Sequence, residues 1–106
     1  MSMFTDKVVV ITGAGSGIGR ALAQRLAGRG ARLALSDVNA KGLDETLKSL
    51  PAVTEARGYA LDVSNRQAVF AHAEDVKRDF STAHCVVNNA GATMIGTIEH
   101  LTIDEI

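Results

Sequence analysis

The sequence predicts a doubly wound α/β fold, in which helices cover both faces of a parallel sheet. Four short apolar segments are separated by three segments whose apolar residues recur every three or four positions. Strands that alternate with helices in this way are joined by right-handed crossovers, so the strands run parallel. The core must be largely aliphatic, because 46% of the 106 residues are hydrophobic and only 4% are aromatic.

The first strand and the first helix flank a glycine-rich turn. Residues 8–11 read Val-Val-Val-Ile and are apolar on both faces, as in a strand buried between two helical layers. After the turn, an apolar ladder at four-residue spacing predicts a helix. The ladder consists of Ile18, Leu22 and Leu26. Gly28 and Gly30 predict the end of this helix.

The next strand and helix repeat this alternation. Residues 32–36 predict the second strand, and Asn39 is placed as the N-cap of the helix that follows. The expected apolar face of that helix consists of Leu43, Leu47 and Leu50. Pro51 closes the helix, because proline cannot continue it.

The third strand is expected at about residues 56–61 and the fourth at residues 85–87. Between them, Ser64-Asn65-Arg66-Gln67 has the pattern of a capping box, with Ser64 as the cap. The apolar stripe of the helix that follows consists of Val69, Ala73, Val76 and Phe80. In the doubly wound fold these four strands take the order 3-2-1-4, and the strands that would extend the sheet are missing from the 106 residues.

The turn after the first strand has the composition of a phosphate-binding loop. It reads Thr12-Gly13-Ala14-Gly15-Ser16-Gly17-Ile18-Gly19. Glycines let backbone N–H groups approach a pyrophosphate, and the following helix N-terminus attracts negative charge. The spacing is T-G-x-x-x-G-x-G and differs from the strict G-x-G-x-x-G. No Gly-Lys-Ser/Thr follows, which disfavours an unrelated phosphate-binding enzyme, and the strand-turn-helix context disfavours glycines that only shape a loop.

This turn and a second motif, Asn88-Asn89-Ala90-Gly91 after the fourth strand, together resemble the short-chain dehydrogenase/reductase family of NAD(P)-dependent oxidoreductases. The resemblance runs from about Lys7 to the last residue. It implies a Rossmann-type doubly wound sheet and hydride transfer between nicotinamide and an alcohol or ketone. The cofactor-binding residues indicated by the loop and by the resemblance are Gly13, Gly15, Ser16, Gly17, Ile18, Gly19, Asp37, Asp62, Val63, Asn89, Ala90 and Gly91.

Asp37 follows Gly19 by 18 residues and ends the second predicted strand. A carboxylate there can accept hydrogen bonds from both hydroxyls of an adenosine ribose, and its charge would repel a 2′-phosphate. NAD is therefore the expected cofactor and NADP the less favoured one. NADP is still possible as the cofactor because of Arg20, since a guanidinium on the first helical turn can approach a phosphate. The competing interpretation of Asp37 is a solvated acid in a loop.

The resemblance also gives roles to the residues after the third and fourth strands. Asp62 and Val63 would meet the adenine ring, while the alternative for Asp62 is that it helps to start the next helix. Asn88 would steady the central sheet. The residues expected to line the nicotinamide-side ribose are Asn89, Ala90 and Gly91.

The catalytic pair of the family, a Tyr and a Lys four residues apart, is absent from the 106 residues. The single tyrosine, Tyr59, is followed four residues later by Val63 and is expected in the core or at its rim. Thr102-Ile103-Asp104-Glu105 has the pattern of a capping box at a helix too short to be stable alone. We therefore expect residues 1–106 to be the N-terminal part of a single NAD(P)-binding Rossmann domain without its catalytic half. The alternative is a truncated, non-catalytic dinucleotide-binding module.

Composition limits the partners and the compartment. The net charge of −1 argues against a nucleic-acid partner. Cys85 cannot form an internal disulfide, so a reducing compartment, by default the cytoplasm, is expected. Residues 1–7 lack a secretory signal, and no apolar run is long enough for a membrane segment. Three histidines lack metal-ligand spacing and are expected in solvent or in ordinary packing, namely His72, His84 and His100. The resemblance implies a small-molecule alcohol or ketone substrate and a homo-oligomer.

Overall fold

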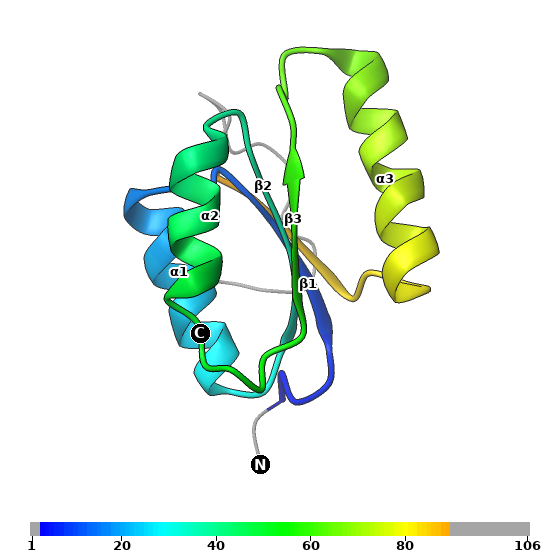
Figure 1. Cartoon of the computed structure of the whole chain (residues 1–106). Coiled ribbons are helices and arrows are strands. Elements are labelled where there is room, and N and C mark those ends of the chain that lie inside the picture. The colour runs from blue at the N-terminus through cyan, green and yellow to red at the C-terminus, as the bar shows by residue number, and fades with distance from the viewer. Residues whose placement is uncertain (1–2, 90–106) are drawn as a thin grey trace.

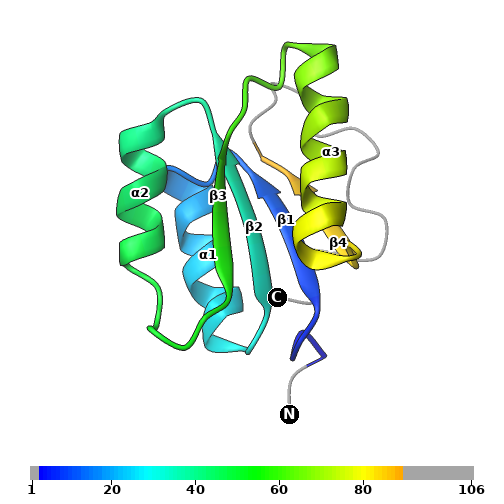
Figure 2. The same ribbon diagram turned by 45° about the vertical axis from the view of Figure 1, so that its right-hand side comes forward.

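The computed structural model describes residues 3–89 of the chain. Its strands are β1 (Val8–Thr12), β2 (Arg32–Asp37), β3 (Ala56–Ala60) and β4 (Cys85–Asn88). They form one parallel sheet in the order β3-β2-β1-β4. Helices α1 (Gly17–Gly28) and α2 (Ala40–Lys48) cover one face of the sheet, and α3 (Arg66–Phe80) covers the other (Figure 1 and Figure 2). The predicted α/β class and strand order are thus confirmed.

The parallel register brings the carboxyl ends of the strands to one edge of the sheet. Thr12 of β1 lies opposite Ser36 of β2 and opposite Asn88 of β4. Asp37 of β2 lies opposite Ala60 of β3. The segments that follow all four strands therefore start side by side. Ligands of doubly wound folds bind at this edge.

The core lies on both sides of β1, which is buried along its whole length. Val9 and Ile11 belong to an apolar cluster that includes residues of α1 and α2. Val8 and Val10 belong to a second cluster, which includes residues of α3. Because successive side chains of a strand point to opposite faces, this alternation explains why the strand is apolar throughout.

The buried face of α1 differs from the predicted ladder. Ile18 is 75% exposed, and Leu22 is only partly buried. The buried residues of the helix are Gly19, Ala23, Leu26 and Ala27. These mostly small side chains let the helix lie close to the sheet. The prediction that Ile18 belongs to the buried face of this helix is therefore wrong. Gly30 has a φ of 85° just beyond the helix, as expected for a residue that ends one.

The start of α2 agrees with the prediction. The Asn39 side chain accepts the N–H of Gly42 at 3.1 Å and caps the helix. Leu43 is buried, and Leu47 and Leu50 pack against the same cluster. The apolar face predicted for this segment is therefore confirmed.

Both the cap and the buried face of α3 differ from the prediction. The N-cap is Asn65, whose side chain accepts a backbone N–H at 3.0 Å. Ser64 is not the cap, because its hydroxyl donates to the Asp62 carboxylate at 2.6 Å. The buried residues of the helix are His72, Val76 and Phe80. Val69 and Ala73 of the predicted stripe are exposed, whereas a polar residue outside the stripe, His72, is buried.

His84 extends the pairing of β1 with β4. Its backbone N–H donates to the carbonyl of Val8 at 2.9 Å, and its Nδ1 atom accepts the N–H of Val8 at 2.9 Å. A histidine before β4 thus satisfies both backbone groups of the first residue of β1. Its role is structural, in line with the expected ordinary packing.

Candidate cofactor site

A pocket of about 490 Å³ opens at the carboxyl edge of the sheet. Its lining residues are Gly13, Ser16, Gly17, Ile18, Asp37, Val38, Leu61, Asp62, Val63 and Asn89. The structure therefore brings together most of the residues that the sequence indicated. Two more do not line the pocket: Gly15 lies in the turn, and Gly19 lies in the first turn of α1. Ala90 and Gly91 lie outside the described residues.

The turn after β1 presents the start of α1 to this pocket. Gly13 and Gly17 have φ angles of 67° and 56°, in the left-handed region that favours glycine. Ser16 is the N-cap, but its side chain makes no capping hydrogen bond, and the first turn of α1 has no acidic residue. The first N–H groups of a helix have no partner within the helix, and its dipole favours an anion there. Because Gly17 and Ile18 line the pocket, this end of α1 fits a phosphate group.

Gly19 allows α1 to approach the turn closely. A Cβ atom at Gly19 would collide with the carbonyl oxygen of Gly13 and would lie 2.8 Å from Nδ2 of Asn89. The same Nδ2 donates to the Gly13 carbonyl at 3.2 Å. Gly19 therefore shapes the pocket through helix packing, although it does not line it.

Asp37 is fixed beside the glycine turn. Its Oδ2 atom accepts the N–H of Gly15 at 2.7 Å, and its Oδ1 atom accepts the N–H of Asn39 at 2.9 Å. A Cβ atom at Gly15 would lie only 2.7 Å from Oδ2, so this approach needs a glycine. Each carboxylate oxygen has a second lone pair, so the group can still accept hydrogen bonds from a ligand in the pocket. Asp37 is thus a fixed negative charge at the pocket wall.

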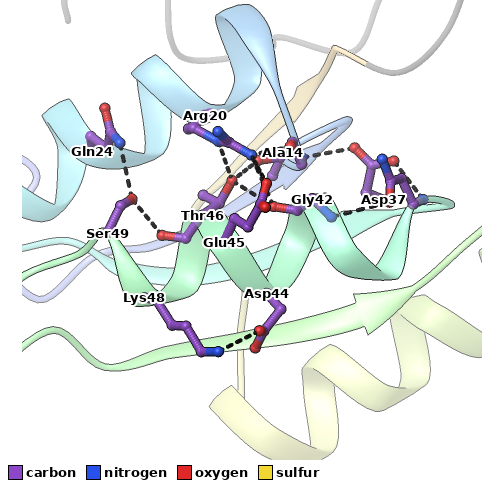
Figure 3. Close-up of polar contacts among 12 residues, drawn as sticks. Ala14, Arg20, Gln24, Asp37, Gly42, Asp44, Glu45, Thr46, Lys48 and Ser49 are labelled. Carbon is purple, nitrogen blue, oxygen red and sulfur yellow. Dashed lines mark hydrogen bonds and ion pairs between the residues drawn. The ribbon is translucent and has the colours of Figure 1, made fainter.

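Arg20 lies on the other side of the turn and points toward α2 (Figure 3). Its Nε atom donates to Oγ1 of Thr46 at 2.9 Å, and its Nη2 atom donates to the carbonyl of Gly15 at 2.6 Å. Arg20 is not among the residues that line the pocket. The expectation that its guanidinium meets a 2′-phosphate gains no support from this position.

Asp62 lies at the pocket wall and also organises the segment before α3. Its Oδ1 atom accepts the N–H and the hydroxyl of Ser64, at 2.9 and 2.6 Å. The hydrogen bonds from the Ser64 hydroxyl and N–H lower the pKa of Asp62, so its carboxylate is held in the charged form. The carbonyl of Asp62 accepts the N–H of Asn65, the N-cap of α3. The two interpretations of Asp62 are therefore compatible, since it lines the pocket and precedes the helix cap.

Hydrogen bonds of Thr12 with Asn88 and Asn89 join the ends of β1 and β4 beside the pocket. The Thr12 hydroxyl donates to Oδ1 of Asn88 at 2.9 Å and accepts the N–H of Asn89 at 3.0 Å. The Asn88 contact agrees with the sheet-steadying role that the resemblance implied. Asn89 reaches the pocket, where its side chain also holds the Gly13 carbonyl.

Thr12, Val38 and Leu61 are site residues that sequence patterns did not indicate. Val38 directly follows β2, and Leu61 directly follows β3, so both lie where the strands end at the pocket. The available signal was their place at a predicted strand end, since Val38 follows the second predicted strand and Leu61 is the last residue of the third. Thr12 was visible as the residue before the first glycine, but its partners lie more than 70 positions away in the sequence.

Other kinds of site find little support in residues 3–89. Within this range, no group of three His, Cys, Asp or Glu side chains is arranged to hold a metal ion. None of the helices in the same range is long and apolar enough to cross a membrane. Tyr59 is half-buried and donates its hydroxyl to Asp79 of α3 at 2.7 Å, as expected for a residue at the rim of the core.

Several known proteins are similar to this chain in both sequence and fold. The chain is 50% identical over 100 residues to the SadH protein of Mycobacterium tuberculosis, covering 93% of this chain and 36% of that protein. It is 38% identical over 100 residues to D-threitol dehydrogenase of Mycolicibacterium smegmatis, covering 93% of this chain and 38% of that enzyme. Its structure matches that of NAD+-bound xylitol dehydrogenase with a TM-score of 0.81 and 41% identity, over 85% of this chain and 35% of that one.

The chain spans little more than a third of the length of these relatives. The family model of the short chain dehydrogenases matches residues 7–106, which is nearly the whole chain. The match includes the glycine turn, the residues after β2 and β3 and the Asn-Asn-Ala-Gly motif. The chain therefore belongs to the short chain dehydrogenase family.

Proposed function

We propose that this chain binds NAD as the cofactor of an oxidoreductase that transfers a hydride between nicotinamide and an alcohol or ketone. The observation that carries the proposal is the pocket in which the uncapped N-terminus of α1 faces the fixed carboxylate of Asp37. One end of this pocket suits a pyrophosphate and the other suits a ribose diol. NAD, when bound, supplies the site at which a hydride is accepted or released.

Each part of the pocket has a proposed contact with the dinucleotide. The residues proposed to hold the pyrophosphate or to shape its loop are Gly13, Gly15, Ser16, Gly17, Ile18 and Gly19. Asp37 accepts hydrogen bonds from the adenosine ribose, and Asp62 and Val63 border the adenine. Asn89, followed by Ala90 and Gly91, is proposed to line the nicotinamide-side ribose.

NAD is favoured over NADP by the charges on the two sides of the turn. The Asp37 carboxylate stands at the pocket wall and would repel a 2′-phosphate. Arg20 could offset that charge, but its guanidinium donates to the Gly15 carbonyl and to Thr46. NAD+-bound xylitol dehydrogenase, which has a closely similar fold, supports the same choice.

The substrate class rests on the family and on the names of the relatives. D-threitol dehydrogenase and xylitol dehydrogenase are both named for alcohols, which supports a small-molecule alcohol or the corresponding ketone. The 106 residues hold no Tyr and Lys four positions apart, so the hydride transfer is proposed for the protein as a whole. Cytoplasmic location, consistent with the lone Cys85, and a homo-oligomeric state belong to the same proposal.

The test is a calorimetric titration of the intact protein with NAD and with NADP, followed by an assay of NADH formation over a panel of alcohols. We expect NAD to bind at least about tenfold more tightly than NADP, a difference of about 1.4 kcal/mol. NAD binding without turnover of any alcohol or ketone would favour the non-catalytic binding module. Absence of NAD binding would reject the proposal.

A further inference from the structure

A cluster of polar contacts joins α1, α2 and the glycine turn (Figure 3). Its two central side chains are Arg20 of α1 and Thr46 of α2, and neither lines the pocket. We call these two residues, with the backbone carbonyls they contact, the α1–α2 polar cluster. The carbonyls belong to Ala14, Gly15 and Gly42.

Arg20 ties the turn to the start of α2. Its Nη2 atom donates to the carbonyl of Gly15 at 2.6 Å and to the carbonyl of Gly42 at 3.2 Å. The same nitrogen lies 3.4 Å from Oε1 of Glu45, and the Nε atom donates to Oγ1 of Thr46. One planar guanidinium thus holds a loop carbonyl, a helix carbonyl and a side-chain hydroxyl in fixed relative positions.

Thr46 holds the neighbouring residue of the turn. Its side chain is fully buried, and its hydroxyl donates to the carbonyl of Ala14 at 2.7 Å. The same oxygen accepts the hydrogen bond from Nε of Arg20 at 2.9 Å. Two successive carbonyls of the turn, those of Ala14 and Gly15, are therefore bonded on the α2 side.

The amide groups of the same two residues are bonded to β2. The N–H of Ala14 donates to the carbonyl of Ser36 at 3.0 Å, and the N–H of Gly15 donates to the Asp37 carboxylate. Gly42 permits this close arrangement, because a Cβ atom there would lie 2.5 Å from the carbonyl oxygen of Gly15. The turn is thus hydrogen-bonded on two sides, to β2 through its N–H groups and to Arg20 and Thr46 through its carbonyls.

We propose that Arg20 and Thr46 are positioning residues for the cofactor's pyrophosphate. Carbonyl oxygens carry negative partial charge, so a turn whose carbonyls could rotate toward the pocket would bind an anion less well. By bonding the carbonyls of Ala14 and Gly15 on the α2 side, the two side chains keep the N-terminus of α1 open for the phosphates. This inference rests on the proposed NAD binding and deepens it.

The test compares two substitutions of Thr46 in the intact protein. Thr46→Val keeps the shape of the side chain but removes the hydroxyl, whereas Thr46→Ser keeps the hydroxyl. We expect Thr46→Val to weaken NAD binding about tenfold or more and to change adenosine binding by less than about twofold, because adenosine has no pyrophosphate. Thr46→Ser should bind NAD within about threefold of the wild type. NAD affinity is measured by calorimetry and adenosine affinity by ligand-observed NMR.

Arg20 gives a second pair of variants in case Thr46→Val fails to fold. Arg20→Met should show the same selective loss of NAD affinity, and Arg20→Lys should recover part of it through a single charged donor. The matched control is Gln24→Met, which removes a bond from α1 to Ser49 at 2.9 Å without touching the turn. This control should leave both affinities unchanged.

Several outcomes would overturn the inference. Unchanged NAD affinity in Thr46→Val and Arg20→Met, or an equal loss of NAD and adenosine affinity, would show that the cluster does not position the pyrophosphate site. In these cases NAD binding by the wild type would leave the proposed function standing. A wild-type protein that does not bind NAD would overturn both proposals.

Discussion

The two faces of the sheet are held together in different ways. On the α1–α2 face, Arg20 and Thr46 donate hydrogen bonds of 2.6 and 2.7 Å to carbonyls of the glycine turn. Asp37 of β2 accepts the N–H of Gly15 in the same turn at 2.7 Å. On the α3 face, His72 is only 8% exposed, and neither ring nitrogen has a hydrogen-bond partner among the described residues. Phe80 and its apolar neighbours dominate the packing there. On the α1–α2 face, polar bonding is thus concentrated at the glycine turn that borders the pocket.

The largest effect is expected from adding a methyl group where α1 meets the turn. In Gly19→Ala the new Cβ would collide with the Gly13 carbonyl and crowd Asn89. We expect a loss of about 2–4 kcal/mol in the free energy of unfolding and no measurable NAD binding. Urea denaturation and calorimetric titration measure the two quantities.

The control for this change is at the other end of the same helix. A Cβ atom at Gly28 would meet nothing within 4 Å. Gly28→Ala should therefore leave NAD affinity unchanged and alter stability by less than about 1 kcal/mol. Equal behaviour of the two alanine variants would show that close approach at Gly19 is not required.

The next largest effect concerns the choice between NAD and NADP. Asp37→Ala removes both the proposed acceptor for the ribose and the acceptor of the Gly15 N–H. We expect NAD binding to weaken about tenfold or more and the NAD-to-NADP affinity ratio to shift toward NADP, since the like charge near a 2′-phosphate is gone. Calorimetry with both cofactors gives the ratio.

Asp44 supplies the control for the loss of a carboxylate. It is exposed and pairs with Lys48 of the same helix at 2.9 Å, away from the pocket. Asp44→Ala should keep the affinity ratio of the wild type. If Asp37→Ala also kept it, the assignment of Asp37 to the ribose would be wrong.

A smaller effect is expected on the α3 face, and it depends on pH. Burial lowers the pKa of His72, although nearby Asp75 opposes the shift, and the ring packs edge-on against Tyr59. The unfolded chain therefore binds a proton more readily than the folded one, so this residue reduces stability as pH falls through about 6.5 toward the folded pKa. His72→Leu should raise the free energy of unfolding by about 1 kcal/mol at neutral pH and reduce the loss of stability on acidification.

Thermal unfolding at pH about 7.5 and about 5.5 compares this variant with the wild type. The melting temperature of His72→Leu should fall less between the two pH values. A larger fall in the variant, or a variant less stable than the wild type at both values, would mean that His72 has a partner that its position does not reveal.

The smallest effect concerns the start of α3. Asn65→Ala removes the side chain that caps the helix and should lower the free energy of unfolding by about 1 kcal/mol. Because α3 lies on the face opposite the α1–α2 polar cluster, NAD affinity should change by less than about twofold. Ser64→Ala removes the residue that the sequence suggested as the cap, and it should lower the free energy of unfolding by less than Asn65→Ala does. Chemical denaturation of the two variants side by side distinguishes them, and the reverse order would restore Ser64 as the cap.

Sequence patterns predicted the parts of the fold that depend on local periodicity. The apolar run at residues 8–11 predicted a strand that is buried on both faces. The glycine turn after it predicted one edge of the pocket. The errors arise where a tertiary contact decides the role of a residue. Ile18 has the spacing of a core residue but lies at the pocket, because Gly19 is the residue that packs. His72 is polar yet buried, and no local pattern marks such an exception.

More of the residues that line the pocket could be predicted from the sequence than of the residues that hold the glycine turn in place. Asp37 could be predicted from its place at the end of the second strand, and Asp62 from the resemblance to the family. The bonds of Arg20 to Gly15, Gly42 and Thr46 were not, because they depend on how closely α2 approaches the turn. That approach follows from the missing side chain at Gly42, and its consequence appears only in three dimensions.

The most direct test of the account is a crystal structure of the intact protein with NAD. We expect the pyrophosphate at the N-terminus of α1 beside Gly17 and Ile18, and the hydroxyls of the adenosine ribose within hydrogen-bonding distance of the Asp37 carboxylate. A nucleotide bound elsewhere, or a ribose turned away from Asp37, would contradict the central claim that this edge of the sheet is the NAD site.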